Sequence, residues 1–302
     1  MDVPTDHEPV GGPFARILPF GEGHRVACGQ SEAGHSLVEF AIGIGEEANS
    51  MPKLRFKYLF RADHFPGQRA IVQVTKIGGV GTFWGYVYVD ADAARIYVSH
   101  ANQTEVVDTK ANKVIGTVTE TPRVHGIAVA ADLGKGYTSN GGNNMVSVFD
   151  LKTLKSTASI PGGMNPDAII YEPKSHRVLS FNGNSKDVTI IDAKTDKVVA
   201  TVPVGGKPEF AQTDAKGMVW VNIEDTAELI EVDAAKATVT RRLKMAGCED
   251  PTGLAIDRKK GRLFAACKGM MTAVDIKGWK VLGTAPTGAG SDGIVFDDGR
   301  AF

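Results

Sequence analysis

The sequence has little of what marks several specialised classes of protein. Cysteine occurs only three times in 302 residues, and Phe, Trp and Tyr together make up 7% of the chain. The formal net charge is −1 and the two signs are interspersed, so the basic footprint of a nucleic-acid-binding protein is missing. No apolar run reaches the roughly 18–20 residues that a membrane helix needs. The composition therefore argues against a nucleic-acid partner and against a membrane span.

Common catalytic signatures are also missing. There is no G-x-S-x-G nucleophile elbow, no H-E-x-x-H and no Cys/His spacing typical of zinc. The glycine pairs at Gly78 and Gly141 lie in predicted β-turns rather than before helices, which argues against phosphate-binding loops. The first residues lack a basic segment followed by an apolar one, so they do not resemble a secretory signal peptide.

What the sequence does contain is a repeated group of short strands. Residues 167–208 hold four apolar runs, AII, RVLSF, VTII and VVATV, separated by turn residues. Short runs rich in Val, Ile and Thr between Gly, Asn, Asp and Pro indicate β-strands, and four in succession indicate an antiparallel meander. Similar units start near residues 85, 125, 167, 209, 252 and 292. A period of about 40 residues with four strands per unit is typical of β-propeller blades.

The sequence predicts an all-β protein with two parts. Residues 1–50 do not fit the repeat and form an N-terminal extension, whereas residues 53–302 form one β-propeller domain. The last repeat is incomplete, and a free sheet edge is a liability. We therefore expect residues 53–60 and 70–77 to supply the two outer strands of a composite last blade, giving six blades. Five blades, or a truncated set of seven, are the alternatives.

The end of each third strand carries an aspartate. These residues could form a ring of metal ligands, but their position favours acceptance of backbone N–H groups in the following turn. They are Asp108, Asp150, Asp192, Asp233 and Asp275.

Two rings of side chains are predicted at one mouth of the central channel. The first precedes the innermost strand of each unit and comprises Gly85, His125, Asp167, Glu209, Thr252 and Asp292. The second ends the neighbouring strand, which runs antiparallel and so finishes beside the first ring. It comprises His100, Asn140, Asn182, Asn222 and Cys267.

These rings suggest two kinds of chemistry. Asp167, Glu209 and Asp292 are hard oxygen ligands suited to Ca²⁺ or another divalent cation. Such an ion could polarise a lactone or ester carbonyl, with His125 or Glu209 as general base. Alternatively, the mouth binds a small polar ligand without catalysis. The candidate ligand-binding residues are His100, Asn140, Asn182, Asn222 and Trp84.

A simpler structural role is available for several of these residues. An Asn at the end of a strand can satisfy the backbone groups of a turn, and carboxylates at a channel mouth can simply be solvated. The aromatic residues near Trp84 could roof a ligand or pack between blades.

Two of the three cysteines are expected close together. Cys248 precedes an innermost strand, and Cys267 ends the strand that pairs with it. A disulfide forms if the two Cα atoms come within about 7 Å, and it would indicate an oxidising compartment. Two buried thiols are the alternative, and Cys28 is left over in either case.

The repeats resemble the YVTN-repeat β-propeller family. The resemblance rests on IYVSH at residues 96–100, GYTSN at 136–140, and strand–turn–strand runs such as VVDTKANKVIGTV and IIDAKTDKVVATVPVGGKP. It covers residues 68–302 and implies a propeller from the bacterial periplasm, cell envelope or secreted fraction. Members include lactone hydrolases and propellers that only bind ligands or proteins. It therefore implies a ligand-binding propeller, a metal-dependent lactonase or a protein-interaction scaffold.

Overall fold

The computed structural model describes residues 84–297 and 299–301, together with four earlier strands. Those four strands are β1 (His24–Arg25), β2 (Glu39–Gly45), β3 (Lys53–Phe60) and β4 (Ala70–Ile77). Cys28, the third cysteine, lies outside the described residues, as does the side chain of Trp84. Among the described residues, no helix has the length and apolar character needed to cross a membrane.

Five consecutive four-stranded antiparallel sheets follow, each a meander in chain order. The first contains β5 (Trp84–Asp90), β6 (Arg95–His100), β7 (Gln103–Asp108) and β8 (Lys113–Val118). The second contains β9 (Val124–Ala130), β10 (Lys135–Asn140), β11 (Met145–Asp150) and β12 (Ser156–Pro161). The third contains β13 (Pro166–Glu172), β14 (Arg177–Asn182), β15 (Asp187–Asp192) and β16 (Lys197–Pro203). The fourth contains β17 (Pro208–Thr213), β18 (Met218–Ile223), β19 (Glu228–Asp233) and β20 (Thr238–Lys244). The fifth contains β21 (Leu254–Asp257), β22 (Arg262–Cys267), β23 (Met270–Asp275) and β24 (Lys280–Pro286).

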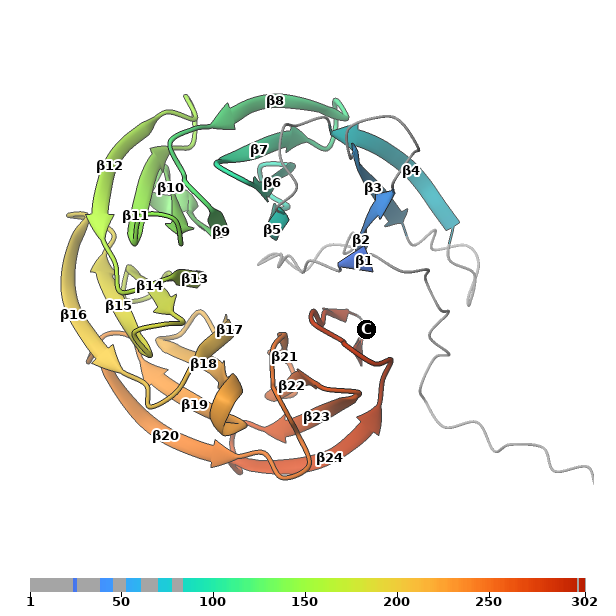
Figure 1. The fold of residues 1–302 in the computed structure, drawn as a ribbon, viewed down its shortest axis with the longest axis vertical. Coiled ribbons are helices and arrows are strands. Elements are labelled where there is room, and N and C mark those ends of the chain that lie inside the picture. The colour runs from blue at the N-terminus through green and yellow to red at the C-terminus, as the bar shows by residue number, and fades with distance from the viewer. Residues whose placement is uncertain are drawn as a thin grey trace, which may run out of the picture.

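The sheets stand around a central axis like the blades of a propeller (Figure 1). The innermost strands contact one another in sequence order, β5 with β9, β9 with β13, β13 with β17 and β17 with β21. Strands β8, β12, β16, β20 and β24 form the periphery. This arrangement confirms the predicted β-propeller of four-stranded blades.

The composite last blade is not formed. Strand β3 pairs with β2 on one side and β4 on the other, in a four-stranded sheet β1–β4. The C-terminal strands β25 (Phe296–Asp297) and β26 (Arg300–Ala301) pair with each other in a separate sheet. Sequence neighbours pair at a lower cost in loop-closure entropy than the two ends of the chain do. Both edges of β3 are therefore already occupied.

The hydrophobic core lies between adjacent sheets. Leu179 and Ile190 of the β13–β16 sheet pack in one cluster with Val219 and Ile230 of the β17–β20 sheet. Second and third strands such as Asp187–Asp192 are buried over their central residues because a sheet covers each face. The outermost strands are instead mostly exposed, and in β20 exposed and half-buried residues alternate.

The aspartate at the end of each third strand holds the following turn. Asp192, for example, accepts hydrogen bonds from the backbone N–H groups of Lys194 and Thr195. Equivalent bonds are made by Asp108, Asp150, Asp233 and Asp275. The structural role predicted for this ring is therefore confirmed.

The same turns connect neighbouring sheets through a residue with positive φ, four positions after the aspartate. Asp196 bonds the Tyr137 hydroxyl and the Lys135 ammonium of the preceding sheet. Trp279 lies over the Arg241 guanidinium at 4.3 Å, and its indole N–H donates to the carbonyl of Arg242. These two turns thus fasten their sheets to the sheets before them.

Candidate functional site

A β-bulge at the inner end of four sheets creates the rim of the channel. In each, two residues of the innermost strand lie opposite one residue of the second strand. The bulged pairs are Gly85–Tyr86, His125–Gly126, Asp167–Ala168 and Glu209–Phe210. Bulges of this kind re-aim side chains and are common beside functional sites. The predicted first ring is therefore in register, because His125, Asp167 and Glu209 occupy equivalent positions.

One member of the predicted second ring is out of register. Met218, not Gly217, pairs with the aspartate that ends the third strand, as Arg177 does in the preceding sheet. Pro208 pairs with Ile223, 15 positions later, whereas Pro166 pairs with Asn182, 16 positions later, so Ile223 is the residue equivalent to Asn182. Asn222 instead lies opposite the bulge, as Ser99 and Ser139 do in their sheets.

In three of the four sheets, the residue opposite the bulge holds the rim of the next sheet. The Ser99 hydroxyl donates to the carbonyl of His125, and the Ser139 hydroxyl donates to that of Asp167. The Asn222 amide donates to the carbonyl of Thr252. Adjacent sheets therefore position each other's rim residues through buried polar side chains.

Three rim carboxylates surround one tyrosine. The Tyr86 hydroxyl is hydrogen-bonded to Asp167, and the negative charges of Asp167, Glu209 and Asp292 all act on it. Burial, followed by these charges, raises the pKa of Tyr86 well above its ordinary value. Its ring meets that of Phe210 edge-on, with centroids 5.2 Å apart. Residues from four parts of the ring thus act on one hydroxyl group.

A histidine and a lysine contact two of these carboxylates. His125 Nδ1 lies 3.3 Å from Asp167 Oδ1, and both side chains are largely buried. Lys207 Nζ lies 2.6 Å from Glu209 Oε1 and also pairs with Glu224. Although burial opposes it, hydrogen bonding to these two carboxylates raises the pKa of Lys207.

Glu209 is the most perturbed acid at the rim. Its burial and the nearby charge of Asp167 raise its pKa to about 8, and the Lys207 ammonium offsets only part of this effect. Only 8% of the residue is exposed. The rim therefore holds an acid that can exchange a proton near neutral pH, and perturbed groups of this kind cluster at functional sites.

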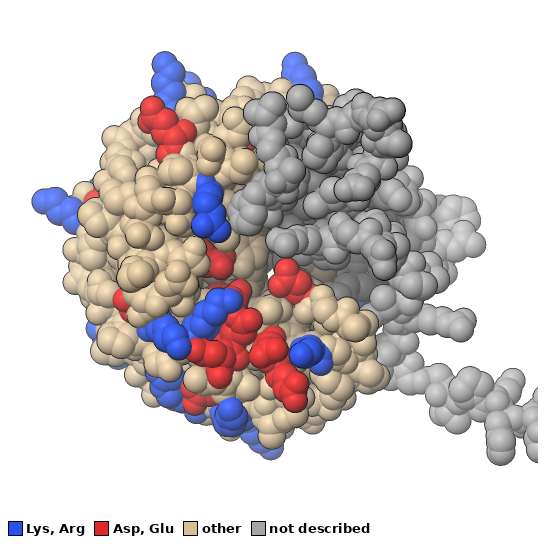
Figure 2. Space-filling model, in the orientation of Figure 1, with Lys and Arg blue, Asp and Glu red and all other residues tan. Residues whose placement is uncertain are grey.

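Carboxylates gather around the central opening of this face. Figure 2 shows Asp and Glu side chains close to the opening, over the sheets that follow β13, with a few Lys and Arg among them. The acids Asp167, Glu209, Glu224 and Asp292 lie at or beside the rim, and Lys207 pairs with two of them. The mouth is therefore suited to a cation more than to an anion.

The predicted second ring does not present exposed groups. His100, Asn140, Asn182 and Asn222 are all fully buried. The Asn140 amide donates to Ser147, and the Asn182 amide donates to Asp187 and Thr189, so these side chains bond within their own sheets. They support the rim from behind rather than lining its surface.

Within residues 84–297 and 299–301, no group of three or more His, Cys, Asp or Glu side chains has a geometry that could hold a metal ion. Asp167 is engaged by His125 and Tyr86, and Glu209 by Lys207. The trio Asp167, Glu209 and Asp292 is thus brought to one mouth without forming a coordination set.

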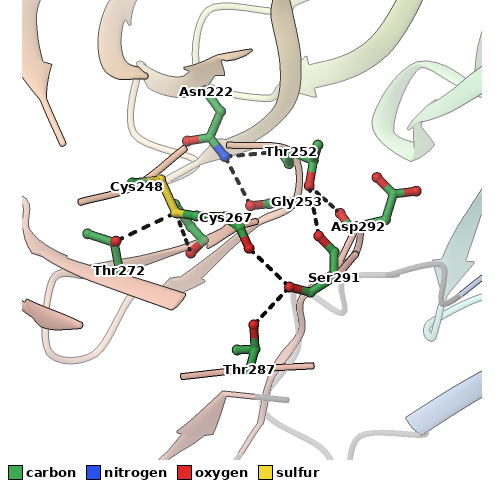
Figure 3. The surroundings of a disulfide bond; sticks show 10 residues. Asn222, Cys248, Thr252, Gly253, Cys267, Thr272, Thr287, Ser291 and Asp292 are labelled. Carbon is green, nitrogen blue, oxygen red and sulfur yellow. Dashed lines mark hydrogen bonds between the residues drawn. A yellow bond between two sulfur atoms is a disulfide. The ribbon is translucent and has the colours of Figure 1, made fainter. Parts of the chain in front are cut away.

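Cys248 and Cys267 form the disulfide that the sequence suggested. Their Cα atoms are 5.2 Å apart, within the range that a disulfide can span. Both residues are buried beside the rim residue Thr252 (Figure 3).

Tyr86, Lys207 and Phe210 belong to the site but were not among the candidate residues. Gly85 occupies the predicted rim position but has no side chain. Because of the bulge, Tyr86 lies with Gly85 opposite Ser99, and its side chain takes part in the rim. The run Lys-Pro-Glu-Phe at residues 207–210 contained a signal, because it places a cation beside the rim Glu209.

Comparisons with known proteins give the fold and a family without an assigned activity. A family model described as "Domain of unknown function (DUF5074)" matches residues 94–251, more than half of the chain. No curated protein matches in sequence. Among solved structures, a chain of Kuenenia stuttgartiensis hydrazine synthase is similar, with a TM-score of 0.54 and 13% identity. The similarity covers 69% of this chain and 88% of that one, and it supports the propeller fold alone.

Proposed function

Since the chain belongs to the DUF5074 family, whose description assigns no activity, we propose its function from the site: the protein binds a small organic cation at the mouth of its central channel. The observation that carries this proposal is the group of rim contacts His125–Asp167, Lys207–Glu209 and Tyr86–Phe210, with the negative charges of Asp167, Glu209 and Asp292 all acting on Tyr86. Concave sites with a few convergent polar groups are the usual places for small ligands.

The charges at the mouth favour a positively charged ligand. Lys207 already shares its charge between Glu209 and Glu224, whereas the side chain in contact with Asp167 is the imidazole of His125. An ammonium group near Asp167 and Asp292 would reduce the repulsion among the rim carboxylates. In a partly buried site, hydrogen bonds to charged groups are roughly twice as strong as neutral ones.

The aromatic pair favours an organic rather than a purely ionic ligand. Tyr86 and Phe210 present apolar ring surface beside the carboxylates. A cation over an aromatic face gains about 0.5–2 kcal/mol, and an attached hydrocarbon group gains from contact with the rings. In this proposal His125 and Glu209 set the charge of the site and perform no chemical step.

The pH dependence of binding follows from Glu209. The neutral acid predominates below its pKa of about 8, and the carboxylate predominates above it. Binding of a permanent cation should therefore strengthen as the pH rises from about 7 to about 9. A quaternary ammonium probe separates this effect from titration of the ligand itself.

Isothermal titration calorimetry with benzyltrimethylammonium tests the proposal, with benzyl alcohol as the neutral match. We expect saturable binding of the cation alone, at least about tenfold weaker in Asp167→Asn, because one charged contact is lost. Asp150→Asn is the matched control, since it removes an acid from an outer turn, and it should bind normally. Equal binding of benzyl alcohol, or an unchanged affinity in Asp167→Asn, would contradict the proposal.

We also propose, by its resemblance to YVTN-repeat propellers, that the protein acts in the periplasm or outside the cell. The Cys248–Cys267 disulfide supports this location, because disulfides persist in oxidising compartments. Fractionation of expressing cells, followed by thiol alkylation, tests it. Protein recovered from the cytoplasm with two free thiols at these positions would contradict it.

A further inference from the structure

The disulfide lies directly behind one part of the rim. Cys248 is in the loop before β21, and Cys267 is the last residue of β22 (Figure 3). The segment between them contains the rim residue Thr252 and its neighbour Gly253. The bond therefore closes a loop that includes one rim position.

The same loop holds the segment that carries Asp292. The Ser291 hydroxyl donates to the carbonyl of Cys267 and also bonds the Thr287 hydroxyl. The Thr252 hydroxyl donates to the carbonyl of Asp292 at 3.0 Å. Both half-cystine segments thus contribute to the position of Asp292, one through Ser291 and the other through Thr252 (Figure 3).

The fit between these segments is close. A Cβ atom at Gly253 would lie 2.6 Å from the carbonyl oxygen of Asp292. Two residues further on, Ile294 is buried against Ala255 and Ala266 of the β21–β22 hairpin. A shift of this hairpin would therefore move Asp292 relative to the other rim carboxylates.

Asp292 differs from the other rim acids in the support that its own strands give. Asp167 begins a four-stranded sheet, and Ser139 of the neighbouring sheet holds its carbonyl. Asp292 precedes the two-stranded β25–β26 sheet, and its carbonyl accepts a hydrogen bond from the Thr252 hydroxyl. Asn222 in turn fixes Thr252 and Gly253 through their carbonyls. The disulfide loop is thus the part that joins Asp292 to the rest of the rim.

We propose that formation of the Cys248–Cys267 disulfide completes the channel-mouth site by fixing the segment that bears Asp292. Binding competence would then be acquired only after the chain reaches an oxidising compartment. This inference rests on the proposed function for its biological meaning, but its structural part does not. The two thiols lose two protons and two electrons to an oxidising disulfide partner, which is reduced to a dithiol by thiol–disulfide exchange.

Hydrogen–deuterium exchange tests the structural part without any ligand. In the double variant Cys248→Ala/Cys267→Ala, peptides covering residues 249–254 and 287–296 should exchange faster. Peptides covering residues 124–192 should be unchanged, which shows that the variant is folded. Ser291→Ala keeps the disulfide and removes only the bond to Cys267, so it should accelerate exchange in residues 287–296 alone.

Affinity for benzyltrimethylammonium tests the functional part. We expect the double variant to bind about tenfold more weakly, close to Asp292→Asn, because a charged contact is lost in both. Unchanged exchange in residues 287–296 of both variants would overturn the inference, as would full affinity in the double variant. If exchange accelerates in the variants but the wild type binds no cation, the proposed function is overturned. The role of the disulfide in positioning Asp292 would still stand.

Discussion

Carboxylates serve opposite purposes at the inner and outer ends of the blades. In the outer turns, Asp108, Asp150, Asp192 and Asp233 have pKa values held below their usual range by N–H and ammonium or guanidinium partners. At the rim, burial and the charge of Asp167 raise the pKa of Glu209. The carboxylates of the outer acids are stabilised by N–H groups and cations close to their own turn. The carboxylates at the rim instead repel one another. The comparison teaches that position within the blade, not residue type, decides what an acid does.

The largest effect on stability is expected from substituting an aspartate of an outer turn. Asp192→Ala removes the acceptor of two turn N–H groups and the partner of Arg177, so it should lower the free energy of unfolding by about 1–2 kcal/mol. Urea denaturation measures the change, and Asp192→Asn, which keeps an acceptor oxygen, should lose less. Benzyltrimethylammonium affinity should stay the same. If Asp192→Ala were as stable as the wild type, the outer aspartates would not stabilise their turns, and the contrast between the outer turns and the rim would fail.

The pH dependence of stability sharpens the comparison. A raised pKa in the folded state means that Glu209 contributes stability fully below its ordinary value of 4.5, and that this contribution is lost as the pH rises through about 8. The outer acids behave oppositely, because their contribution is present above their ordinary pKa and is lost as the pH falls through the depressed one.

Glu209→Gln should therefore remove a decline in unfolding free energy, on the order of 1 kcal/mol or more, between pH 5 and pH 9. Denaturation curves at pH 5, 7 and 9 measure it. Glu224→Gln, which removes the other partner of Lys207, is the control and should keep the decline. An identical decline in Glu209→Gln and the wild type would show that Glu209 titrates normally.

The smallest effect concerns the positive-φ residue of the outer turns. Ala237→Gly should stabilise the protein by about 0.5 kcal/mol, because glycine adopts this conformation without the steric cost of a Cβ atom. Trp279→Gly relieves the same strain but loses the contacts with Arg241 and Arg242, so it should be destabilising. Thermal melts distinguish the two. Equal shifts in both variants would mean that Trp279 does not fasten adjacent sheets.

Features repeated in every blade were predictable from the sequence. The period of about 40 residues predicted the propeller, since each blade needs the same strands and turns. The turn role of Asp192 and the register of His125, Asp167 and Glu209 followed from the same repetition. The Cys248–Cys267 disulfide followed from antiparallel pairing.

Features in which one blade departs from the repeat were not predictable. A β17–β18 hairpin that is one residue shorter than its counterparts moved Asn222 from the second ring to the position opposite the bulge. The bulge also brought Tyr86 across the channel, which simple alternation of side chains does not foresee. The pairing of β3 with its sequence neighbours left the C-terminal strands to form their own sheet. Each difference comes from backbone geometry that composition and spacing do not encode.

The bulge at the inner end of four blades has a consequence for how such a protein diversifies. One added residue interrupts the strict alternation of the strand, and pairing resumes normally beyond it. A rim side chain can therefore be exchanged without turning any core residue to the wrong face of its sheet. Gly85, His125, Asp167 and Glu209 illustrate this freedom, because four unlike residues occupy one position of the same scaffold. New specificities can arise there by single substitutions, while the folding information remains in the strands behind.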